Sequence, residues 1–321
     1  MFESNIINIY GKKGKQWLDD LPKLIMRVEA TYGLSNLKPV NNLSYNYVLS
    51  GLQGSQPIIL KLGLDIDGFK REAAALMAFS GFGVVEVLSA NNGLLLLECA
   101  VPGVSLKSHF PENDDEAINI TANVIKRLHK APIPSAHVFP HIKDPGYAGG
   151  FAEASWLEAL DGDLKIPVQT LQKARQLRDQ LLKTAKPDVL LHGDLHHDNI
   201  LQNSDDKSRR SSQSEDGWVA IDPKGVIGEP AYEVAAFIRN PIPELLTHAD
   251  APNIIHNRIT RFAELLELPS QRILDWCFVQ AVLSWVWAIE DLSPEALAQG
   301  DGSDDTYSKN FTEFFERYTD V

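Results

Sequence analysis

Cysteine is scarce in this chain, and the little that is present cannot build a cross-linked or metal-bound framework. The 321 residues include 2 cysteines, Cys99 and Cys277, which lie far apart and outside any CxxC pair. Thiolate zinc sites need clustered cysteines and disulfide scaffolds need several of them, so neither is expected. A reducing, cytoplasmic location fits this composition best.

Long apolar runs and an excess of positive charge are also missing. No run of about 18 apolar residues occurs, so no membrane-spanning helix is expected, and "MFESNIINIYGKKGK" lacks the apolar core of a signal peptide. Lys and Arg number 30 against 43 Asp and Glu, which gives a net charge of −13. A general nucleic-acid binder would need a basic face. The acidic balance suits a cationic ligand, although many cytoplasmic proteins are equally acidic.

The N-terminal part of the chain predicts a small antiparallel sheet with helices. Apolar residues at helical spacing predict a helix over 12–33, with a kink or break at Pro22. "NYVLSG" and "PIILKLG" are predicted strands around the turn "LQGSQ", and "GFKREAAALMAFSG" is a predicted helix that ends at Gly81. "VVEVLSANNGLLLLEC" predicts two more strands, joined at Asn-Asn-Gly. This order suits a sheet with one helix packed on it.

The rest of the chain is predicted to be mostly helical. "AVPGV", 100–104, is a candidate hinge, which divides the chain into lobes of residues 1–99 and 100–321. Two short strands near 199–202 and 218–222 flank a polar, Ser-rich loop at 203–217. The fold class is therefore α+β, with a larger, helical C-terminal lobe. The helices expected there span 113–130, 151–160, 168–185, 231–238, 256–267, 271–291 and 308–318.

The stretch "LLHGDLHHDNIL", Leu190–Leu201, has two interpretations. A metal hydrolase would use its histidines and aspartates as ligands, but such a shell needs further ligands from other strand ends. A kinase would use Asp194 to accept the proton of the attacking hydroxyl, and Asn199, at the D-L-x-x-x-N spacing, to hold Mg²⁺. Asp222, at the end of the next strand, supplies the second hard oxygen ligand that Mg²⁺ prefers. In this interpretation His192 orients the loop, and residues 196–198 support it.

An independent signal lies in the N-terminal part. Lys61 interrupts the apolar strand "IILKLG", where a charge without a partner would be costly. Glu72 opens the helical run that follows. A kinase needs this combination to bind and orient the nucleotide phosphates. Alone, Lys61 could equally be a lysine on an edge strand; the residues downstream favour the functional interpretation.

These stretches resemble the aminoglycoside phosphotransferase family, which has a protein-kinase-like fold, and its streptomycin 6-kinase or aminoglycoside/hydroxyurea resistance branch in particular. "LLLLECAVPGVSL", "HGDLHHDNIL" and "AIDPKGVIGEPAYEVAAFIRNP" carry the resemblance, which runs from about residue 11 to 291. It implies that Asp194 is the catalytic base, that Asn199 and Asp222 bind Mg²⁺, and that Lys61 and Glu72 form the ATP-binding pair. It also implies that Glu98 to Ala100 form the hinge whose backbone meets adenine.

The chain departs from protein kinases in two places. No G-x-G-x-x-G loop occurs, and "NNLSYNYVLSG" stands in its place, so Ser44 to Asn46 are the candidates for covering the phosphates. Asp222-Pro223-Lys224-Gly225 replaces D-F-G, and no A-P-E segment follows. A constitutive small-molecule kinase is therefore expected.

The acceptor is predicted from the remaining acidic residues. Glu290 and Asp291 end an apolar, Trp-rich helix, where negative charge is unfavourable by about 0.3–1 kcal/mol. A cationic acceptor such as streptomycin would compensate it, and Glu229 and Glu233 are candidates for the same cleft. A solvated acidic loop is the plain alternative.

A kinase of an ordinary hydroxylated metabolite and a catalytically inactive nucleotide-binding module remain as rival functions. Neither nucleic acid nor a membrane is expected as a partner.

Overall fold

The structure, a computed structural model, describes residues 2–41, 43–144, 166–185, 187–203, 216–290 and 303–319. The chain forms two compact units, each of which takes two segments of the sequence. The N-terminal unit comprises Met1–Gly103 with Gln202–Ile221, and the C-terminal unit comprises Val104–Leu201 with Asp222–Val321. The predicted helix at 151–160 and nearly all of the predicted loop at 203–217 lie outside the described residues.

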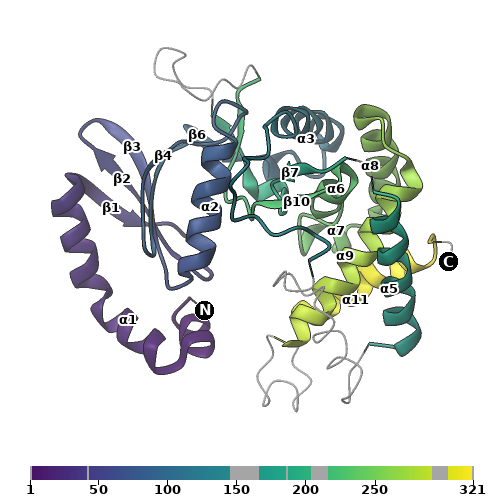
Figure 1. The fold of residues 1–321 in the computed structure, drawn as a ribbon, viewed down its shortest axis with the longest axis horizontal. Coiled ribbons are helices and arrows are strands. Elements are labelled where there is room, and N and C mark those ends of the chain that lie inside the picture. Colours follow the sequence, from purple (N-terminus) through teal and green to yellow (C-terminus); the bar gives the residue numbers. More distant parts are fainter. Residues whose placement is uncertain are drawn as a thin grey trace. The chain divides into compact units, whose positions relative to one another are not determined.

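The N-terminal unit is built on a five-stranded antiparallel sheet of order β1-β2-β3-β5-β4, which Figure 1 shows with α1 and α2 on opposite sides. The predicted hairpins are both present, and β1 is an additional strand at the edge. The elements are α1 (Phe2–Tyr32), β1 (Leu34–Pro39), β2 (Tyr47–Gln53), β3 (Gln56–Leu62), α2 (Ile66–Ala78), β4 (Val87–Asn91) and β5 (Leu94–Glu98).

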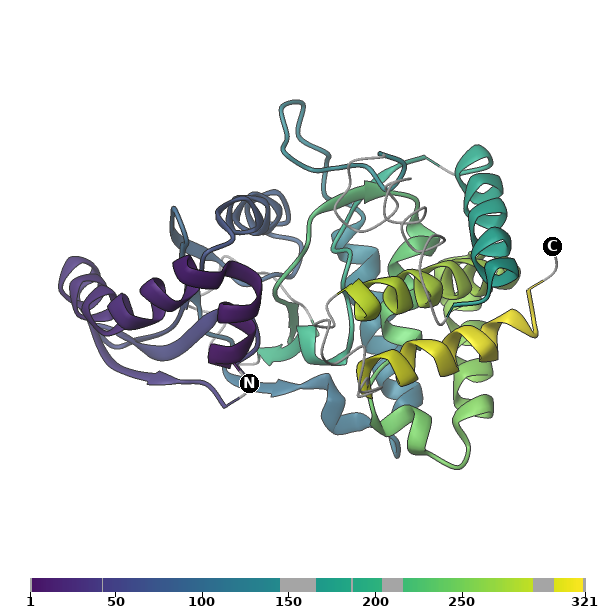
Figure 2. The same cartoon turned by 90° about the horizontal axis from the view of Figure 1, so that it is seen from below.

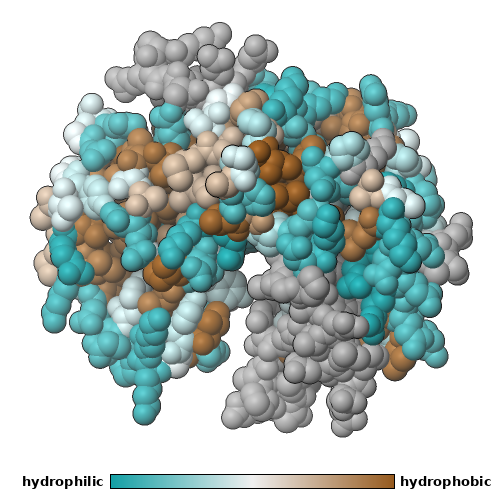
Figure 3. Space-filling view, viewed as in Figure 1, coloured by the Kyte–Doolittle hydropathy of each residue, from teal (hydrophilic) through white to brown (hydrophobic). Residues whose placement is uncertain are grey.

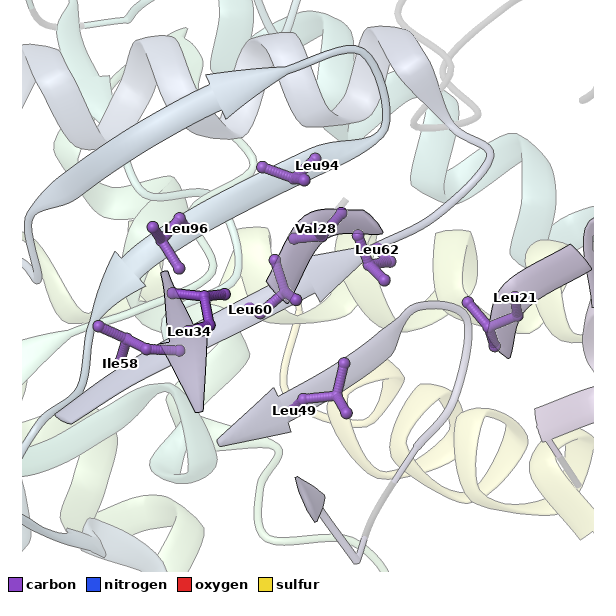
Figure 4. Close-up of a cluster of buried hydrophobic side chains, with 9 residues drawn as sticks. All are labelled: Leu21, Val28, Leu34, Leu49, Ile58, Leu60, Leu62, Leu94 and Leu96. Carbon is purple, nitrogen blue, oxygen red and sulfur yellow. The ribbon is translucent and has the colours of Figure 1, made fainter. Parts of the chain in front are cut away.

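One face of this sheet packs on α1. Alternate residues of β3, Ile58, Leu60 and Leu62, are fully buried against Leu21 and Val28 of the helix. Figure 4 shows these side chains together with the rest of the cluster. Because side chains alternate across a strand, Lys61 points to the other face, which α2 covers. The sheet therefore places one charged side chain of a central strand beneath a helix.

The expected break of α1 at Pro22 was wrong. The helix runs through Pro22, and its one non-helical residue is Gly11, with φ 55° and ψ −130°. Glycine lacks the Cβ that opposes this backbone conformation. A Cβ at Gly14 would lie 2.4 Å from the Ile6 carbonyl oxygen, so the chain turns back closely after Gly11. The bend thus occurs where the side chains are smallest.

Residues 202–221 complete the N-terminal unit from far along the sequence. The Ala220 N–H donates to the Gly83 carbonyl at 2.8 Å, and the Val101 N–H donates to Asn203 Oδ1 at 3.3 Å. Asn203 and Ala220 belong to a three-stranded sheet of order β6-β8-β9. Its strands are β6 (Pro102–Ser105), β8 (Ile200–Asn203) and β9 (Trp218–Ala220).

The C-terminal unit is mostly helical, as expected, with α9 (Ser270–Glu290) near its centre (Figure 2). Trp276 and Trp285 are almost fully buried. By length and composition Ser270–Ile289 could cross a membrane, but 67% of its most apolar window is buried inside the protein, as in a core helix. The other α-helices that the structure describes in this unit are α3 (Asp114–Leu128), α5 (Val168–Lys183), α6 (Pro230–Ile238), α7 (Glu244–Thr247), α8 (Ala251–Leu266) and α11 (Ser303–Glu316).

A small two-stranded sheet holds the functional loop of this unit. Strands β7 (Val189–Leu191) and β10 (Val226–Gly228) pair in antiparallel register, Leu191 opposite Val226. "HGDLHHDN" leaves the end of β7 and continues through the short helix η2 (His197–Asn199), and η1 (Leu106–His109) lies against it. The segment from Asp222 leads directly into β10, so the pairing brings these two stretches of sequence together.

On the face in Figure 3, hydrophobic residues form patches among hydrophilic ones. Large exposed apolar side chains include Met26 on α1, Met77 on α2 and Val138 in the segment after α3. Scattered apolar residues of this kind are ordinary on a folded protein.

Candidate active site

A buried ion pair marks the N-terminal unit. Lys61 Nζ lies 2.8 and 2.7 Å from the two carboxylate oxygens of Glu72, and the two residues are 6% and 7% exposed. The edge-strand alternative for Lys61 was wrong, because β3 pairs with β2 on one side and with β5 on the other. Removing one partner of such a pair typically costs about 3–5 kcal/mol, and an apolar pair could replace it without loss. The pair is therefore better explained by a role in ligand binding than by a contribution to folding stability.

The predicted hinge follows β5. Glu98 is held by its backbone and its side chain, since Oε2 accepts from the Glu86 N–H at 3.2 Å. The Cys99 N–H donates to the Pro57 carbonyl at 3.3 Å. The Ala100 N–H has no hydrogen-bond partner among the described residues, and Ala100 is 6% exposed. A fixed backbone with an unused donor is suited to the edge of a planar ring.

The predicted phosphate-covering segment connects β1 to β2. Ser44 is exposed, and its carbonyl oxygen accepts from Asn5 Nδ2 at 3.2 Å. A Cβ added at Gly63 would lie 2.3 Å from Asn46 Oδ1, so this segment comes close to the end of β3. No contact distinguishes Ser44 as a ligand, and its role stays a prediction.

Asp194 is an accessible carboxylate of the catalytic loop, with 36% of its side chain exposed. Its Oδ1 lies 3.9 Å from His196 Nε2, and its Oδ2 lies 3.6 Å from Lys224 Nζ. Asn199 Nδ2 donates to the Asp194 carbonyl at 2.8 Å and lies 3.2 Å from His196 Nε2. The amide nitrogen of Asn199 thus stabilises the loop, and its Oδ1 atom is the expected metal ligand.

Asn199 and Asp222 offer the amide and carboxylate oxygens that Mg²⁺ prefers, so the donor chemistry fits this ion. Asp222 has φ +59°, a left-handed conformation that few residues other than glycine adopt. Such strain costs about 1–3 kcal/mol and tends to gather at functional sites. Both residues belong to the C-terminal unit, and their metal-binding role stays a prediction.

The histidines of the motif do not converge on a metal. Within the described ranges, no group of three His, Cys, Asp or Glu side chains is arranged to hold one. His192 is fully buried, and its Nδ1 accepts from the Asp194 N–H at 3.3 Å, so it shapes the loop as expected. His197 is buried and stacks on Phe237, with ring centroids 3.9 Å apart.

Glu233 supports the catalytic loop from inside the protein. It is 2% exposed, and its carboxylate accepts from the N–H groups of His192 at 2.7 Å and Gly193 at 2.9 Å. Burial alone would raise the pKa of this carboxyl, but the adjacent His129 imidazole, 3.6 Å away, and the Gly193 N–H hold it below the ordinary value. This corrects the expectation of an acceptor ligand, because the carboxylate is already engaged with backbone and is closed to solvent.

The expectation for Glu229 is corrected in the same way. It is 1% exposed and forms a two-pronged ion pair with Arg272, at 2.6 and 2.7 Å, and also accepts from the Trp276 indole N–H. These contacts join the start of α6 to α9. Glu290 is the last residue of α9, but its side chain and all of Asp291 lie outside the described part of the chain.

Sequence reasoning missed the network that holds the loop from below. Arg258 of α8 is fully buried, pairs with Asp114 through two nitrogens, and donates to the carbonyls of Phe237, Ile238 and Asn240. Its guanidinium also lies 3.4 Å from His197 Nε2. Burial, and then the charge of Arg258, lower the pKa of His197 well below 6.5, so this imidazole is neutral.

This network leaves almost no trace in the sequence. An Arg inside the apolar pattern of α8 is the one available signal, and its partner Asp114 is 144 residues away.

Two features define the class of enzyme. The first is an antiparallel sheet with a buried Lys–Glu pair beneath a helix. The second is a helical unit whose loop presents an Asp and an Asn. The protein is a phosphotransferase of the protein-kinase-like fold. Comparison with known proteins narrows the assignment from this class to a family. The model of the aminoglycoside/hydroxyurea antibiotic resistance kinases matches residues 35–292, and the chain belongs to this family.

Individual relatives agree with this assignment. Streptomycin 6-kinase of Streptomyces griseus is 26% identical, with 88% of this chain and 87% of that protein covered. Streptomycin 3''-kinase of Klebsiella pneumoniae is 28% identical, with 77% and 85% covered. Among solved structures, aminoglycoside phosphotransferase APH(4)-Ia with ADP and hygromycin B has a TM-score of 0.64 at 14% identity, with 91% and 97% covered. That likeness extends the protein-kinase-like fold over nearly the whole chain.

Proposed function

We propose that the protein transfers the γ-phosphoryl group of ATP to a hydroxyl of an aminoglycoside-like, streptomycin-type acceptor. The observation that carries this is the loop around Asp194, whose accessible carboxylate is held by buried residues and followed by Asn199 and Asp222. Streptomycin kinases among its relatives point to the acceptor class. The scarcity of cysteine and the dependence on ATP favour a cytoplasmic location.

The reaction follows from the chemistry of the loop. Asp194 accepts the proton of the acceptor hydroxyl, and the hydroxyl oxygen forms a bond to the γ-phosphorus. The bond from that phosphorus to the bridging oxygen breaks, and its electron pair leaves with ADP. Catalysis of this type rests on positioning and on compensating charge. Mg²⁺, held by Asn199 and Asp222, would supply charge compensation, and Lys61 with Glu72 would orient the nucleotide phosphates.

An acidic chain with a net charge of −13 suits a cationic acceptor. With Glu229 and Glu233 buried, Glu290 and Asp291 are the remaining acidic candidates for contacting the guanidinium or ammonium groups. The second candidate function is phosphorylation of an ordinary hydroxylated metabolite, such as a sugar or an amino alcohol, by the same nucleotide machinery.

Purified enzyme with Mg²⁺ and ATP should phosphorylate streptomycin, and mass spectrometry of the product should show the added phosphoryl group. Asp291→Asn should raise KM for streptomycin and leave KM for ATP unchanged. Glu267→Gln, on an acidic residue after α8, is the matched control and should change neither value. Transfer to a neutral sugar but not to streptomycin would replace the proposal with the metabolite kinase.

A further inference from the structure

Lys224 is hydrogen-bonded to the catalytic loop although it comes 30 residues after Asp194 in the sequence. The N–H groups of Lys224 and Gly225 both donate to the His192 carbonyl, at 2.8 and 3.2 Å. A Cβ added at Gly193, whose φ is +84°, would lie 3.3 Å from Lys224 Cβ. The stem of the lysine therefore packs closely over the residue that precedes Asp194, where the positive φ favours glycine.

The ammonium group of Lys224 ends beside the base. Nζ lies 3.6 Å from Asp194 Oδ2, and the Lys224 side chain remains 55% exposed. Ion pairs with this exposure contribute little to folding stability. The structure thus fixes the backbone of this lysine firmly and leaves its charge at an accessible position next to the one carboxylate that must meet the acceptor hydroxyl.

Positive charge next to the transferred phosphoryl group assists phosphoryl transfer. Charge spreads over the equatorial oxygens of the transferred group, and donors aimed at it stabilise the transition state. The base must come within hydrogen-bond reach of the attacking hydroxyl, so a cation beside the base also lies beside the phosphorus being attacked. The catalytic loop itself carries His196 near Asp194, and no lysine or arginine occurs in "HGDLHHDN". Asp-Pro-Lys-Gly supplies the cation from a different segment.

We propose that Lys224 is a further catalytic residue, which contacts the γ-phosphoryl group of ATP and neutralises its charge while Asp194 takes the proton. This assignment rests on the proposed function, because it uses the same base. In it, Lys224 exchanges part of its interaction with Asp194 for the phosphoryl oxygens when the nucleotide is bound. The competing role is purely positional, with Lys224 holding Asp194 in place and never touching the phosphoryl group.

The test separates these roles by comparing nucleotides with and without a γ-phosphate. Lys224→Met and Lys224→Arg are measured by calorimetry with Mg²⁺ and either ADP or AMP-PNP, and by steady-state turnover with ATP and streptomycin. Lys126→Met, which removes an exposed lysine of α3 in the same unit, is the control. Circular dichroism establishes that each variant is folded.

Lys224→Met should weaken AMP-PNP binding by about ten-fold, the value of a hydrogen bond to a charged group, and leave ADP binding unchanged. It should lower kcat by about 10²–10³-fold, as for other donors to transition-state charge. Lys224→Arg should recover part of both losses, and Lys126→Met should resemble the wild type.

Two results would overturn the assignment. A loss of kcat without any change in the preference for AMP-PNP over ADP would make Lys224 a positioning residue, and an unchanged kcat would leave it no role in turnover. If the wild type fails to phosphorylate streptomycin, the acceptor in the proposed function is wrong, but the comparison of the two nucleotides still decides the role of Lys224.

Discussion

Asp194 and its neighbours divide the work of the loop between accessible and buried side chains. Asp194 remains accessible, while His192, Glu233 and Asn199 use their hydrogen bonds to fix the backbone around it. Glu233 alone binds two consecutive N–H groups, and hydrogen bonds to an ionised acceptor are the stronger kind. These hydrogen bonds hold the base in position, and phosphoryl transfer depends largely on positioning.

Asp194→Asn should abolish turnover and leave Mg²⁺-ATP binding nearly intact. The amide has the same shape but cannot accept the hydroxyl proton, and losses of this kind are about 10²–10⁴-fold in rate. Steady-state kinetics and calorimetry measure the two effects separately. Asp188→Asn, on the exposed carboxylate that pairs with His141 before β7, is the control. A variant at position 194 with wild-type kcat would show that the base lies elsewhere.

At the scale of elements, α8 and α3 act together as the support of the catalytic loop. Arg258 joins Asp114 of α3 to the end of α6 and to His197 of η2. Phe110 and Phe237 also lie against its guanidinium, at 5.5 and 5.1 Å from the ring centroids. Four elements therefore depend on a single buried charge.

Arg258→Met should destabilise the protein by about 3–5 kcal/mol, because it leaves the Asp114 carboxylate buried without its partner. Urea unfolding measures this free energy. Arg261→Met, on the same helix but in a partly exposed pair with Glu264, should change it by about 0.5 kcal/mol or less. A second substitution, Asp114→Leu, should recover part of the loss in the Arg258 variant. Equal stabilities for the two arginine variants would contradict this account.

His197 should make stability depend on pH. The pKa of His197 in the folded protein lies well below 6.5. Just below pH 6.5, His197 is therefore protonated in the unfolded chain and neutral in the folded protein. The free energy of unfolding therefore falls as the pH drops below about 6.5, by up to about 1.4 kcal/mol per pH unit from this group. His197→Gln should show a shallower fall between pH 7.5 and 5.5, measured by urea unfolding. Parallel curves would show that His197 is not the source.

Some elements could be predicted from the sequence and others could not. The two hairpins, α2 and the long C-terminal helices have clear periodicity and turns, and were found. β1 escaped because it is an edge strand with a bulge, a left-handed Asn36 and Pro39, which together remove the alternation. β7 and β10 have three residues each, too few for any periodicity.

The candidate site divides along similar lines. The spacing of Asp194, Asn199 and Asp222 is local, and so is the charge of Lys61 in an apolar strand, so motifs identify them. The buried roles of Glu229 and Glu233 depend on Arg272, Trp276 and backbone groups that only folding brings together. An acidic residue near a motif has the same appearance in a sequence whether it faces a ligand or the core.

For the whole molecule, ATP should stabilise the fold, and Mg²⁺ should be required for the full effect. A ligand at 100 times its Kd adds about 2.7 kcal/mol to the free energy of unfolding. Thermal unfolding with ATP should therefore show a large upward shift of Tm with Mg²⁺ and a smaller one with EDTA. Asp222→Asn should reduce the difference between the two conditions. Identical shifts with and without the metal would count against Asn199 and Asp222 as its ligands.

The discontinuous N-terminal unit has a consequence for the order of events during synthesis. Its sheet emerges early, but Gln202–Ile221, which pairs with Gly83 and Val85 through Ala220, is translated after the catalytic loop. At about 5–20 residues per second, Ile221 follows Gly103 by roughly 6 to 24 seconds. During that interval the nascent unit lacks the segment whose Ala220 bridges to Val84 and Val85. Its folding therefore finishes only after the ribosome has passed the loop on which the chemistry depends.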